Sequence, residues 1–325
     1  KCNYLNDPGA AQCVNCHAPL VTICPRCGAP RPWYAPRCPR CETAAPDEAM
    51  FAELFRKVPS ERLRGRYLLQ EALGASRISA VYKGVDAQTG GLVAVKELAP
   101  TALFRPQERR DAETALRGAL ERWGAMDHPA LPKLVDSFSA HGKYYVVFSY
   151  IEGWSLRRVL AERRWRIGGD LARNWGAQLA RLGQALHAHQ PPLYMPFLSP
   201  GHVMVTPGGE VKLIDWGLTH LFAPNVYGPY GSVQGYGAPE LAEGYPTPQS
   251  DLFSLGRLLY ALLAGQLLEK GLGAAMPLRQ AAPGTSDQLV KAIARAAHRD
   301  PAQRYGSMDE FASALWDAMY GDLLP

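Results

Sequence analysis

All seven cysteines of this 325-residue chain lie within its first 41 residues. The six from Cys13 onward form three Cys-x-x-Cys pairs, at Cys13–Cys16, Cys24–Cys27 and Cys38–Cys41. Secreted disulfide frameworks scatter their cysteines and do not leave the rest of a long chain without one. The pairs therefore favour metal binding in a reducing compartment, and we expect a cytoplasmic protein.

The cysteine pairs have the spacing of zinc-binding knuckles. Cys24–Cys27 and Cys38–Cys41 can place four thiolates tetrahedrally around one Zn²⁺, as in a closed structural site. Cys13–Cys16 needs a second cysteine pair to complete a zinc site. We expect Cys2 to be the second cysteine of that pair, with the first cysteine before Lys1. The chain is therefore expected to begin inside a motif. Redox-active pairs are the alternative, although three regular knuckles exceed what a thiol oxidoreductase uses.

Residues 1–42 resemble a double zinc ribbon. The resemblance implies two structural zinc ions, without which so small a segment should unfold. The zinc sites also lower the formal net charge of +5 to about +2, because seven thiolates contribute −7 and two zinc ions +4. The expected metal ligands are Cys2, Cys13, Cys16, Cys24, Cys27, Cys38 and Cys41.

Two other binding classes are less favoured. Zinc ribbons and the basic aromatic cluster at 163–166 leave a nucleic-acid-binding module open as an alternative. The small net charge and the lack of an extended basic stripe argue against nucleic acid as a partner, and a solvated helix end is the preferred explanation of the cluster. The longest apolar stretch, 258–268, contains Gly265 and Gln266 and is shorter than the about 18 residues of a membrane span, so none is predicted.

Residues 43–61 differ in composition from the cysteine-rich segment. Proline stands near both ends, and Met50, Phe51, Leu54 and Phe55 share one face at helical spacing. We expect a linker helix that packs on the next domain. A partner-binding or autoinhibitory helix is the alternative.

From Tyr67 onward, β-strand patterns come first and helical patterns follow. Short β-rich runs alternate with turn residues, one charged stretch has helical character, and helical periodicity dominates beyond Ser155. The predicted strands are 67–73, 78–87, 92–98, 134–140 and 143–151, and the helix between them is 106–124. The sequence predicts an α+β fold with a small β-rich lobe at 62–152 and a large helical lobe at 153–325.

Seven short motifs then point to a family. They are Val93-Ala-Val-Lys96, Asp127-His-Pro129, Glu152-Gly-Trp-Ser-Leu156, Leu213-Ile-Asp-Trp-Gly217, Ala238-Pro-Glu240, Ser250-Asp-Leu-Phe-Ser-Leu-Gly256 and Arg299-Asp-Pro-Ala-Gln-Arg304. In this order and rough spacing they resemble bacterial Hanks-type Ser/Thr protein kinases, over about residues 62–320. The resemblance implies the two-lobed protein-kinase-like fold.

The resemblance also implies a nucleotide site with a degenerate phosphate-covering loop. Gly74 remains, and Ser76 and Ser79 stand where the second and third glycines of such a loop lie. Lys96 matches the lysine that pairs with the phosphates and Asp215 the aspartate that holds Mg²⁺, so ATP or ADP with Mg²⁺ at Asp215 is the expected ligand. The expected nucleotide-binding residues are Gly74, Ser76, Ser79, Val81, Ala94, Lys96, Phe148, Ser149, Ile151, His202 and Asp215.

The catalytic positions of the family carry other residues. The general-base aspartate aligns with Phe197, the phosphate-contacting lysine with Ser199 and the metal-binding asparagine with His202, which either ligates a softer metal or is a structural residue. Ala119 takes the place of the glutamate that holds the phosphate lysine, and Pro196 replaces the arginine that receives an activation-loop phosphate. Losing one acid/base group costs about 10²–10⁴-fold in rate, so we expect no catalytic residue in this chain.

The scaffold positions of the family are retained. Glu240 and Arg304 match an ion pair that ties the activation segment to the large lobe, and Asp251 matches the residue that braces the catalytic-loop backbone. We therefore expect a pseudokinase, a signalling scaffold or allosteric module with a protein partner that senses nucleotide, rather than an enzyme. A divergent active kinase or nucleotidyl transferase that uses Lys96 and Asp215 is the alternative.

Overall fold

The computed structural model describes residues 21–23, 30–32, 62–75, 79–98, 106–163, 167–196, 198–219, 235–242, 244–268 and 277–320. The seven predicted zinc ligands, the linker helix 43–61, Ser76, Phe197 and residues 164–166 of the basic cluster lie outside the described residues. The chain divides into two compact units. The first unit comprises residues 1–117, 135–148 and 222–227, and the second comprises 118–134, 149–221 and 228–325.

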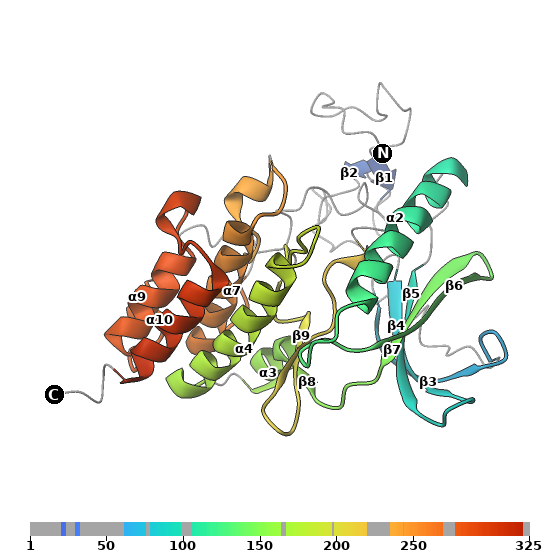
Figure 1. The fold of residues 1–325 in the computed structure, drawn as a ribbon, viewed down its shortest axis with the longest axis horizontal. Helices are drawn as coiled ribbons and strands as arrows, with labels where there is room; N and C mark the ends of the chain where they lie inside the picture. The colour runs from blue at the N-terminus through green and yellow to red at the C-terminus, as the bar shows by residue number, and fades with distance from the viewer. Residues whose placement is uncertain are drawn as a thin grey trace. The chain divides into compact units, whose positions relative to one another are not determined.

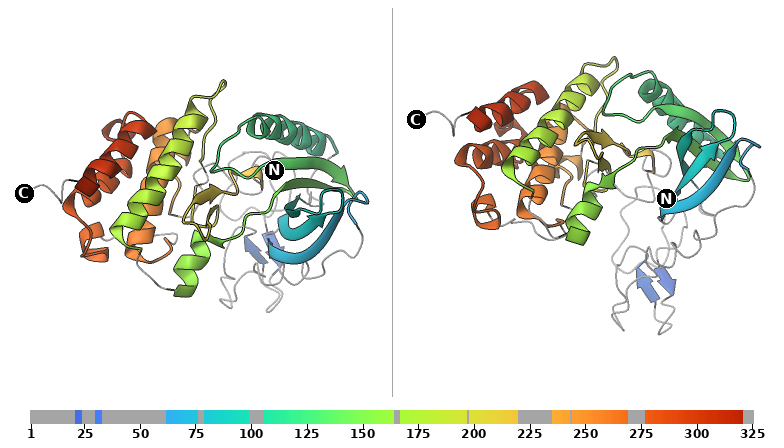
Figure 2. Two further views of the ribbon diagram at one scale, coloured as in Figure 1. Left: turned by 60° about the horizontal axis from the view of Figure 1, so that its bottom comes forward. Right: turned by 90° about the horizontal axis from the view of Figure 1, so that it is seen from below.

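Two short strands are described in the cysteine-rich segment (Figure 2). β1 (Val21–Ile23) pairs antiparallel with β2 (Pro30–Pro32), with Val21 opposite Pro32. The Cys24–Cys27 pair falls in the connection between the two strands. A hairpin whose connection carries a cysteine pair is compatible with the predicted zinc ribbon.

Five strands, most of them within the first unit, form one sheet in the order β3-β4-β5-β7-β6 (Figure 1). The pairs β3–β4 and β4–β5 are antiparallel. The strands are β3 (Tyr67–Ala75), β4 (Ser79–Asp86), β5 (Leu92–Leu98), β6 (Leu134–Ala140) and β7 (Lys143–Ser149), which confirms all five predicted strands.

One face of this sheet carries the apolar core of the first unit. Tyr82, Val93, Val95 and Tyr145 belong to this core cluster, and all four are buried. Successive residues of a strand point to opposite faces, so the residues between them lie on the other face. In β4 and β5, one set of alternate residues therefore packs into the core, and the other set lies on the face that is available for a ligand.

A buried carboxylate lies at the edge of the same core. The side chain of Glu97 is fully buried, and it accepts hydrogen bonds from Lys143 Nζ at 2.6 Å and from Tyr145 OH at 3.1 Å. Burial, together with the nearby charge of Glu97, raises the pKa of Tyr82 to about 12. The lysine and the hydroxyl satisfy a charge that would otherwise be expensive to bury.

Helix α2 (Pro106–Gly124) has the bounds that the sequence predicts. Proline is favoured at the first position of a helix, and glycine at its end. The buried residues of α2 recur at intervals of three or four and so form one face, as expected for an amphipathic helix. They are Ala112, Leu116, Ala119, Leu120 and Trp123.

The second unit is mainly helical, as predicted. In Figures 1 and 2 the helices α4, α7, α9 and α10 lie side by side. A small sheet in the order β10-β9-β8 is formed by β8 (Trp154–Ser155), β9 (Val203–Val205) and β10 (Val211–Leu213). The helices are α3 (Leu156–Arg163), α4 (Gly169–His187), α7 (Pro248–Ala264), α8 (Leu278–Ala281), α9 (Asp287–Ala296) and α10 (Met308–Tyr320), with 3-10 turns η2 (Pro239–Ala242) and η3 (Pro301–Gln303).

Helix α7 is the most buried helix of this unit, and local signals set both of its ends. Thr247 and Ser250 form a reciprocal capping box, with Pro248 at the first helical position. The helix stops at Gly265, whose φ of 67° places it in the left-handed region that glycine adopts without strain. Within the described stretches, no helix is long and apolar enough to cross a membrane.

Candidate functional site

The predicted nucleotide-binding residues of the first unit share one face of its sheet. Val81 of β4 lies opposite both Gly74 of β3 and Lys96 of β5, so the three form a row across three strands. Ser79 and Ala94 lie two residues from Val81 and Lys96, and therefore on the same face. This face is opposite to the one that carries the apolar core.

The row places a lysine in an enclosed position. Lys96 is only 7% exposed, and the side chain of Ser79 is buried as well. Gly74 has open space where a Cβ would lie, so that end of the row is uncrowded. The structure thus places Gly74, Ser79, Val81 and Lys96 on one face of the sheet, while Ser76 lies outside the described residues.

Helix α2 carries Ala119 at the position where the resemblance implies a carboxylate. Ala119 is buried on the apolar face of the helix, and Glu121 is exposed. Glu113 accepts a hydrogen bond from Ser139 Oγ at 3.1 Å. The prediction that neither glutamate shares the helical face of Ala119 agrees with the exposure of Glu121.

In the second unit, the two predicted metal-site residues lie on neighbouring segments. The antiparallel pairing of β9 and β10 extends one residue further, because Ile214 N donates to His202 O at 2.8 Å. Asp215 follows directly. Its Oδ1 accepts hydrogen bonds from Gly217 N and Leu218 N, at 2.9 and 3.1 Å. These contacts fix the turn on which Asp215 stands.

Trp216, the residue after Asp215, stacks on a tryptophan of α2. The ring centroids of Trp123 and Trp216 are 4.1 Å apart, and their planes are inclined by 14°. Both side chains are buried. Sequence reasoning missed this pair, although Trp123 lies four residues after Ala119 and so on the same helical face.

Asp251 of α7 holds the catalytic-loop backbone, as predicted. Its Oδ2 accepts hydrogen bonds from Met195 N at 2.8 Å and interacts with His187 Nε2 at 2.9 Å. Its Oδ1 is buried and has no hydrogen-bond partner among the described residues, and Pro196, next along the loop, has no N–H to offer. Burial raises the pKa of Asp251, an effect that His187 and Met195 N partly offset.

The predicted ion pair between Glu240 and Arg304 is confirmed. Arg304 donates to both carboxylate oxygens of Glu240, at 2.6 and 2.9 Å. The guanidinium also donates to the carbonyl oxygens of Gln249, His298 and Arg299. The arginine is buried, and its hydrogen bonds join η2, α7 and the segment before η3.

A second arginine anchors the segment that precedes η2. Arg257 Nε of α7 donates to Gly235 O at 2.8 Å, and Tyr236 OH accepts from Leu268 N at 3.1 Å. Burial lowers the pKa of the Arg257 guanidinium and raises that of Tyr236. Sequence reasoning missed this anchor, because nothing local marks an arginine in a helix as the partner of a distant carbonyl.

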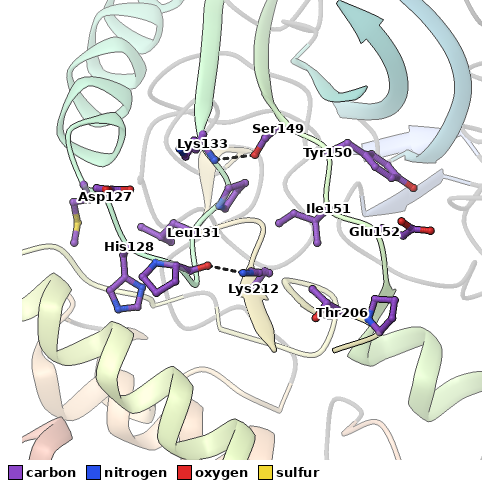
Figure 3. A pocket seen from close by; sticks show the side chains of 14 residues that line it. Asp127, His128, Leu131, Lys133, Ser149, Tyr150, Ile151, Glu152, Thr206 and Lys212 are labelled. Carbon is purple, nitrogen blue, oxygen red and sulfur yellow. Dashed lines mark hydrogen bonds between the residues drawn. The ribbon is translucent and has the colours of Figure 1, made fainter. Parts of the chain in front are cut away.

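Two predicted residues, Ser149 and Ile151, line a pocket of about 560 Å³ that lies wholly within the second unit (Figure 3). None of the other predicted nucleotide-binding residues lines it. Its lining residues come from three segments: Met126, Asp127, His128, Pro129, Leu131, Pro132 and Lys133; Ser149, Tyr150, Ile151 and Glu152; and Thr206, Pro207 and Lys212. Phe148, expected at the back of the nucleotide site, is buried in the first unit.

Comparison with known proteins identifies two sequence families along the chain. The protein kinase domain family matches residues 67–314, and the double zinc ribbon family matches residues 1–51. The serine/threonine-protein kinase PrkC of Bacillus subtilis is 26% identical over 287 residues, which are 81% of this chain and 42% of that protein. The serine/threonine-protein kinase PknA of Mycobacterium tuberculosis is 30% identical over 273 residues, which are 78% of this chain and 61% of that protein.

Solved structures share the two-lobed kinase fold. The apo form of PpkA-294 superposes with a TM-score of 0.67 at 20% identity, covering 80% of this chain and 99% of that one. The kinase domain of Mycobacterium tuberculosis PknI gives a TM-score of 0.63 at 23% identity, with the same coverage of 80% and 99%. The chain spans less than two thirds of the length of the two curated relatives.

Proposed function

Because the chain belongs to the protein kinase domain family, with a β-rich and a helical lobe and a double zinc ribbon at its N-terminal end, we propose that it is a pseudokinase. It would act as a scaffold or allosteric protein-interaction module that senses nucleotide. The reducing compartment that its paired cysteines favour is the cytoplasm.

One observation carries the proposal: three catalytic positions of the family are occupied by residues that cannot do the chemistry. Phe197 offers no base, Ser199 no cation and His202 no amide oxygen for Mg²⁺. The alignment of this loop is supported by its neighbours, since Met195 is held by Asp251 and His202 pairs with Ile214. Phosphoryl transfer depends on positioning and charge stabilisation, and each of these three positions contributes to them.

Nucleotide binding is supported by what remains on the two units. The row from Gly74 through Val81 to Lys96 offers an enclosed lysine for the phosphates and open space at the Cβ position of Gly74. Asp215 is an oxygen ligand of the kind that Mg²⁺ prefers, and bound Mg²⁺ would neutralise phosphate charge there. Within this chain, Lys96 would hold the phosphates and Asp215 the ion.

The zinc ribbon fits a structural role in this proposal. Thiolates in paired knuckles form closed tetrahedral sites without an open position for a substrate, and they would be supplied here by the seven N-terminal cysteines. Two such sites would order a segment too small to have a core of its own. The ribbon would then present a fixed surface to a protein partner.

A thermal-shift experiment tests the nucleotide part. Zinc-loaded protein is heated with ATP or ADP, with Mg²⁺ and with EDTA, beside Lys96→Ala and the surface control Lys291→Ala. A ligand that binds only the native state raises its stability, so at 100 times Kd we expect a gain of about 2.7 kcal/mol, or roughly 5–10 °C. The shift should vanish in Lys96→Ala and persist in Lys291→Ala. No shift at millimolar nucleotide would remove nucleotide sensing from the proposal.

A transfer assay tests the pseudokinase part. Radiolabelled ATP is incubated with the protein alone and with a generic protein substrate, and no transfer above background is expected. Transfer that survives purification to homogeneity and disappears in Asp215→Ala would establish a divergent active kinase and overturn the proposal.

A further inference from the structure

The pocket in the second unit has preformed walls. Lys133 N donates to Ser149 Oγ at 3.0 Å, and Ser149 N donates to Lys133 O at 2.9 Å, so these two segments are locked together (Figure 3). Lys212 Nζ donates to Pro129 O at 2.7 Å and joins the third segment to the first. A site that is already in place loses little conformational entropy when a ligand binds.

The floor of the pocket is apolar. Figure 3 shows Leu131 and Ile151 in the middle part of the pocket, between Asp127 and Glu152, and Met126 also belongs to its lining. The prolines of the lining have no N–H and hold their backbones rigid. A volume of about 560 Å³ is within the usual range for a small-ligand site and holds a few side chains of a peptide.

The two ends of the pocket carry acidic side chains. In Figure 3, Asp127 lies at one end beside His128, and Glu152 lies at the other beside Tyr150. Both carboxylates are exposed, and within the described part of the chain neither has an ion-pair or hydrogen-bond partner. Burial, with the charge of Lys212, lowers the pKa of His128, so the imidazole beside Asp127 is neutral at pH 7.

The cations of the pocket do not neutralise these ends. Lys212 is only 18% exposed, and its ammonium is shared between Glu210 Oε2 at 2.9 Å and Pro129 O. Lys133 is exposed, and among the described residues its ammonium forms no ion pair with Asp127 or Glu152. The pocket therefore presents an apolar middle between two negative ends.

We propose that this pocket docks a short extended peptide segment of a partner protein, with apolar side chains at its centre and a basic side chain toward each end. The inference rests on the proposed scaffold function, for which it supplies a place and a chemistry. The Gly74–Val81–Lys96 row contributes no residue to the pocket, whereas Ser149 and Ile151 of its lining are also expected to bind nucleotide. Acidic peptides and nucleic acid are disfavoured, since the unpaired carboxylates would repel them.

Fluorescence anisotropy on the zinc-loaded 325-residue chain tests the proposal. The probes are labelled peptides with Leu-Pro-Leu at the centre, zero to three alanines on each side, and arginine at both ends. Matched sets have glutamine or glutamate in place of the arginines. We expect saturable binding in the arginine set, at least about tenfold weaker binding for the glutamine set, and none for the glutamate set.

Variants connect the binding to the pocket. The double variant Asp127→Asn/Glu152→Gln should weaken the arginine peptides by at least about tenfold, and Ile151→Ala should weaken all arginine peptides that bind. The matched control Glu71→Gln/Asp309→Asn removes two exposed carboxylates elsewhere and should bind as the unaltered chain does. An unchanged circular dichroism spectrum in each variant separates lost docking from lost folding.

Three results would overturn the docking proposal: no binding across the arginine set at millimolar protein, equal binding of the glutamate set, or equal effects of the pocket and control variants. The thermal shift with ATP is measured on the same samples. Peptide binding without a nucleotide shift keeps the docking surface and removes nucleotide sensing. A nucleotide shift without peptide binding keeps nucleotide sensing and removes the docking surface.

Discussion

The indole of Trp123 lies almost flat against the indole of Trp216, with ring centroids 4.1 Å apart. Through this contact the end of helix α2 supports the turn on which Asp215 stands. Both rings are buried, so the contact adds apolar burial to the stacking attraction itself.

A double-mutant cycle measures how strongly the two tryptophans are coupled. Trp123→Leu and Trp216→Leu should each destabilise the protein, and the double variant should lose less than the sum, with a coupling of about 0.5–1.5 kcal/mol in urea unfolding. The control cycle pairs Trp123→Leu with Trp175→Leu, since the Trp175 indole N–H donates to Gly209 O instead. Additive behaviour in both cycles would show that the stacking contributes nothing specific.

Removing Arg304 should be severely destabilising. Arg304→Met leaves the Glu240 carboxylate and three carbonyl oxygens without their donor, and breaking a buried pair in this way costs about 3–5 kcal/mol. Arg279→Met is the matched control, because the Arg279–Asp287 pair is largely exposed on both sides. Surface pairs contribute little, so this control should unfold at nearly the same urea concentration as the parent. Similar midpoints for the two variants would contradict the assigned role of Arg304.

Gly153 should tolerate no side chain. Its φ is 152°, and a Cβ would lie 2.2 Å from Val205 O, within the pairing of β8 with β9. We expect Gly153→Ala to lower the free energy of unfolding by about 3 kcal/mol or more. At a fixed urea concentration, a larger fraction of the variant should therefore be unfolded. Gly208→Ala, where a Cβ would meet only Thr206 Oγ1 at 3.8 Å, should change stability by a few tenths of a kcal/mol. Equal effects would show that β8 and β9 can separate without loss.

The raised pKa of Asp251 makes a signed prediction about pH. A carboxyl whose folded pKa lies above its unfolded pKa contributes stability that is present below the unfolded pKa, about 3.9, and is lost as pH rises through the folded pKa. The free energy of unfolding of the parent relative to Asp251→Asn should therefore fall between pH 4 and pH 7.

The control for this pH series is an exposed aspartate with the opposite shift. The hydrogen bond from Arg279 lowers the pKa of Asp287, so the parent should lose stability relative to Asp287→Asn as pH falls instead. Parallel pH curves for the parent and Asp251→Asn, or a difference of the opposite sign, would contradict the raised pKa of Asp251.

Zinc analysis checks the N-terminal segment. We expect about two zinc ions per chain and about one in Cys38→Ser. Once a chelator has removed the metal, we expect fast proteolysis before residue 62, because structural zinc supplies most of the folding free energy of such modules. The ATP-dependent thermal shift, measured with Mg²⁺ restored after the zinc and the chelator have been removed, should persist, because Lys96 and Asp215 lie outside the cysteine-rich segment. Seven thiols that react freely in the native protein, with less than one zinc ion bound, would refute both sites.

Regular elements could be predicted from the sequence because their signals are local. Helix α2 matches its expected bounds, since Pro106 and Gly124 mark its ends and its apolar residues recur at helical spacing. Strands β4 and β5 are likewise predicted from β-rich runs between turn residues. The family resemblance supplied the Glu240–Arg304 pair, which joins residues 64 positions apart and which no local pattern could show.

The features that were missed depend on contacts between distant segments. In the sequence, nothing distinguishes Arg257 from any other helix residue. Only the structure shows that its Nε donates to Gly235 O. The docking pocket has the same character, because Leu131 and Ile151 come from separate segments and Lys212 closes the pocket from a third. Such sites form where loops pack together, so they cannot be predicted from residue types alone.

The anchor between Arg257 and Gly235 has a consequence for how this protein can be controlled. Its donor is a guanidinium that stays protonated at every physiological pH, and its acceptor is a main-chain carbonyl that no enzyme modifies. Neither a phosphatase nor modest acidification therefore removes the donor or the acceptor of this contact. The segment before η2 therefore stays tied to helix α7 when the pH or the phosphorylation of hydroxyl groups changes.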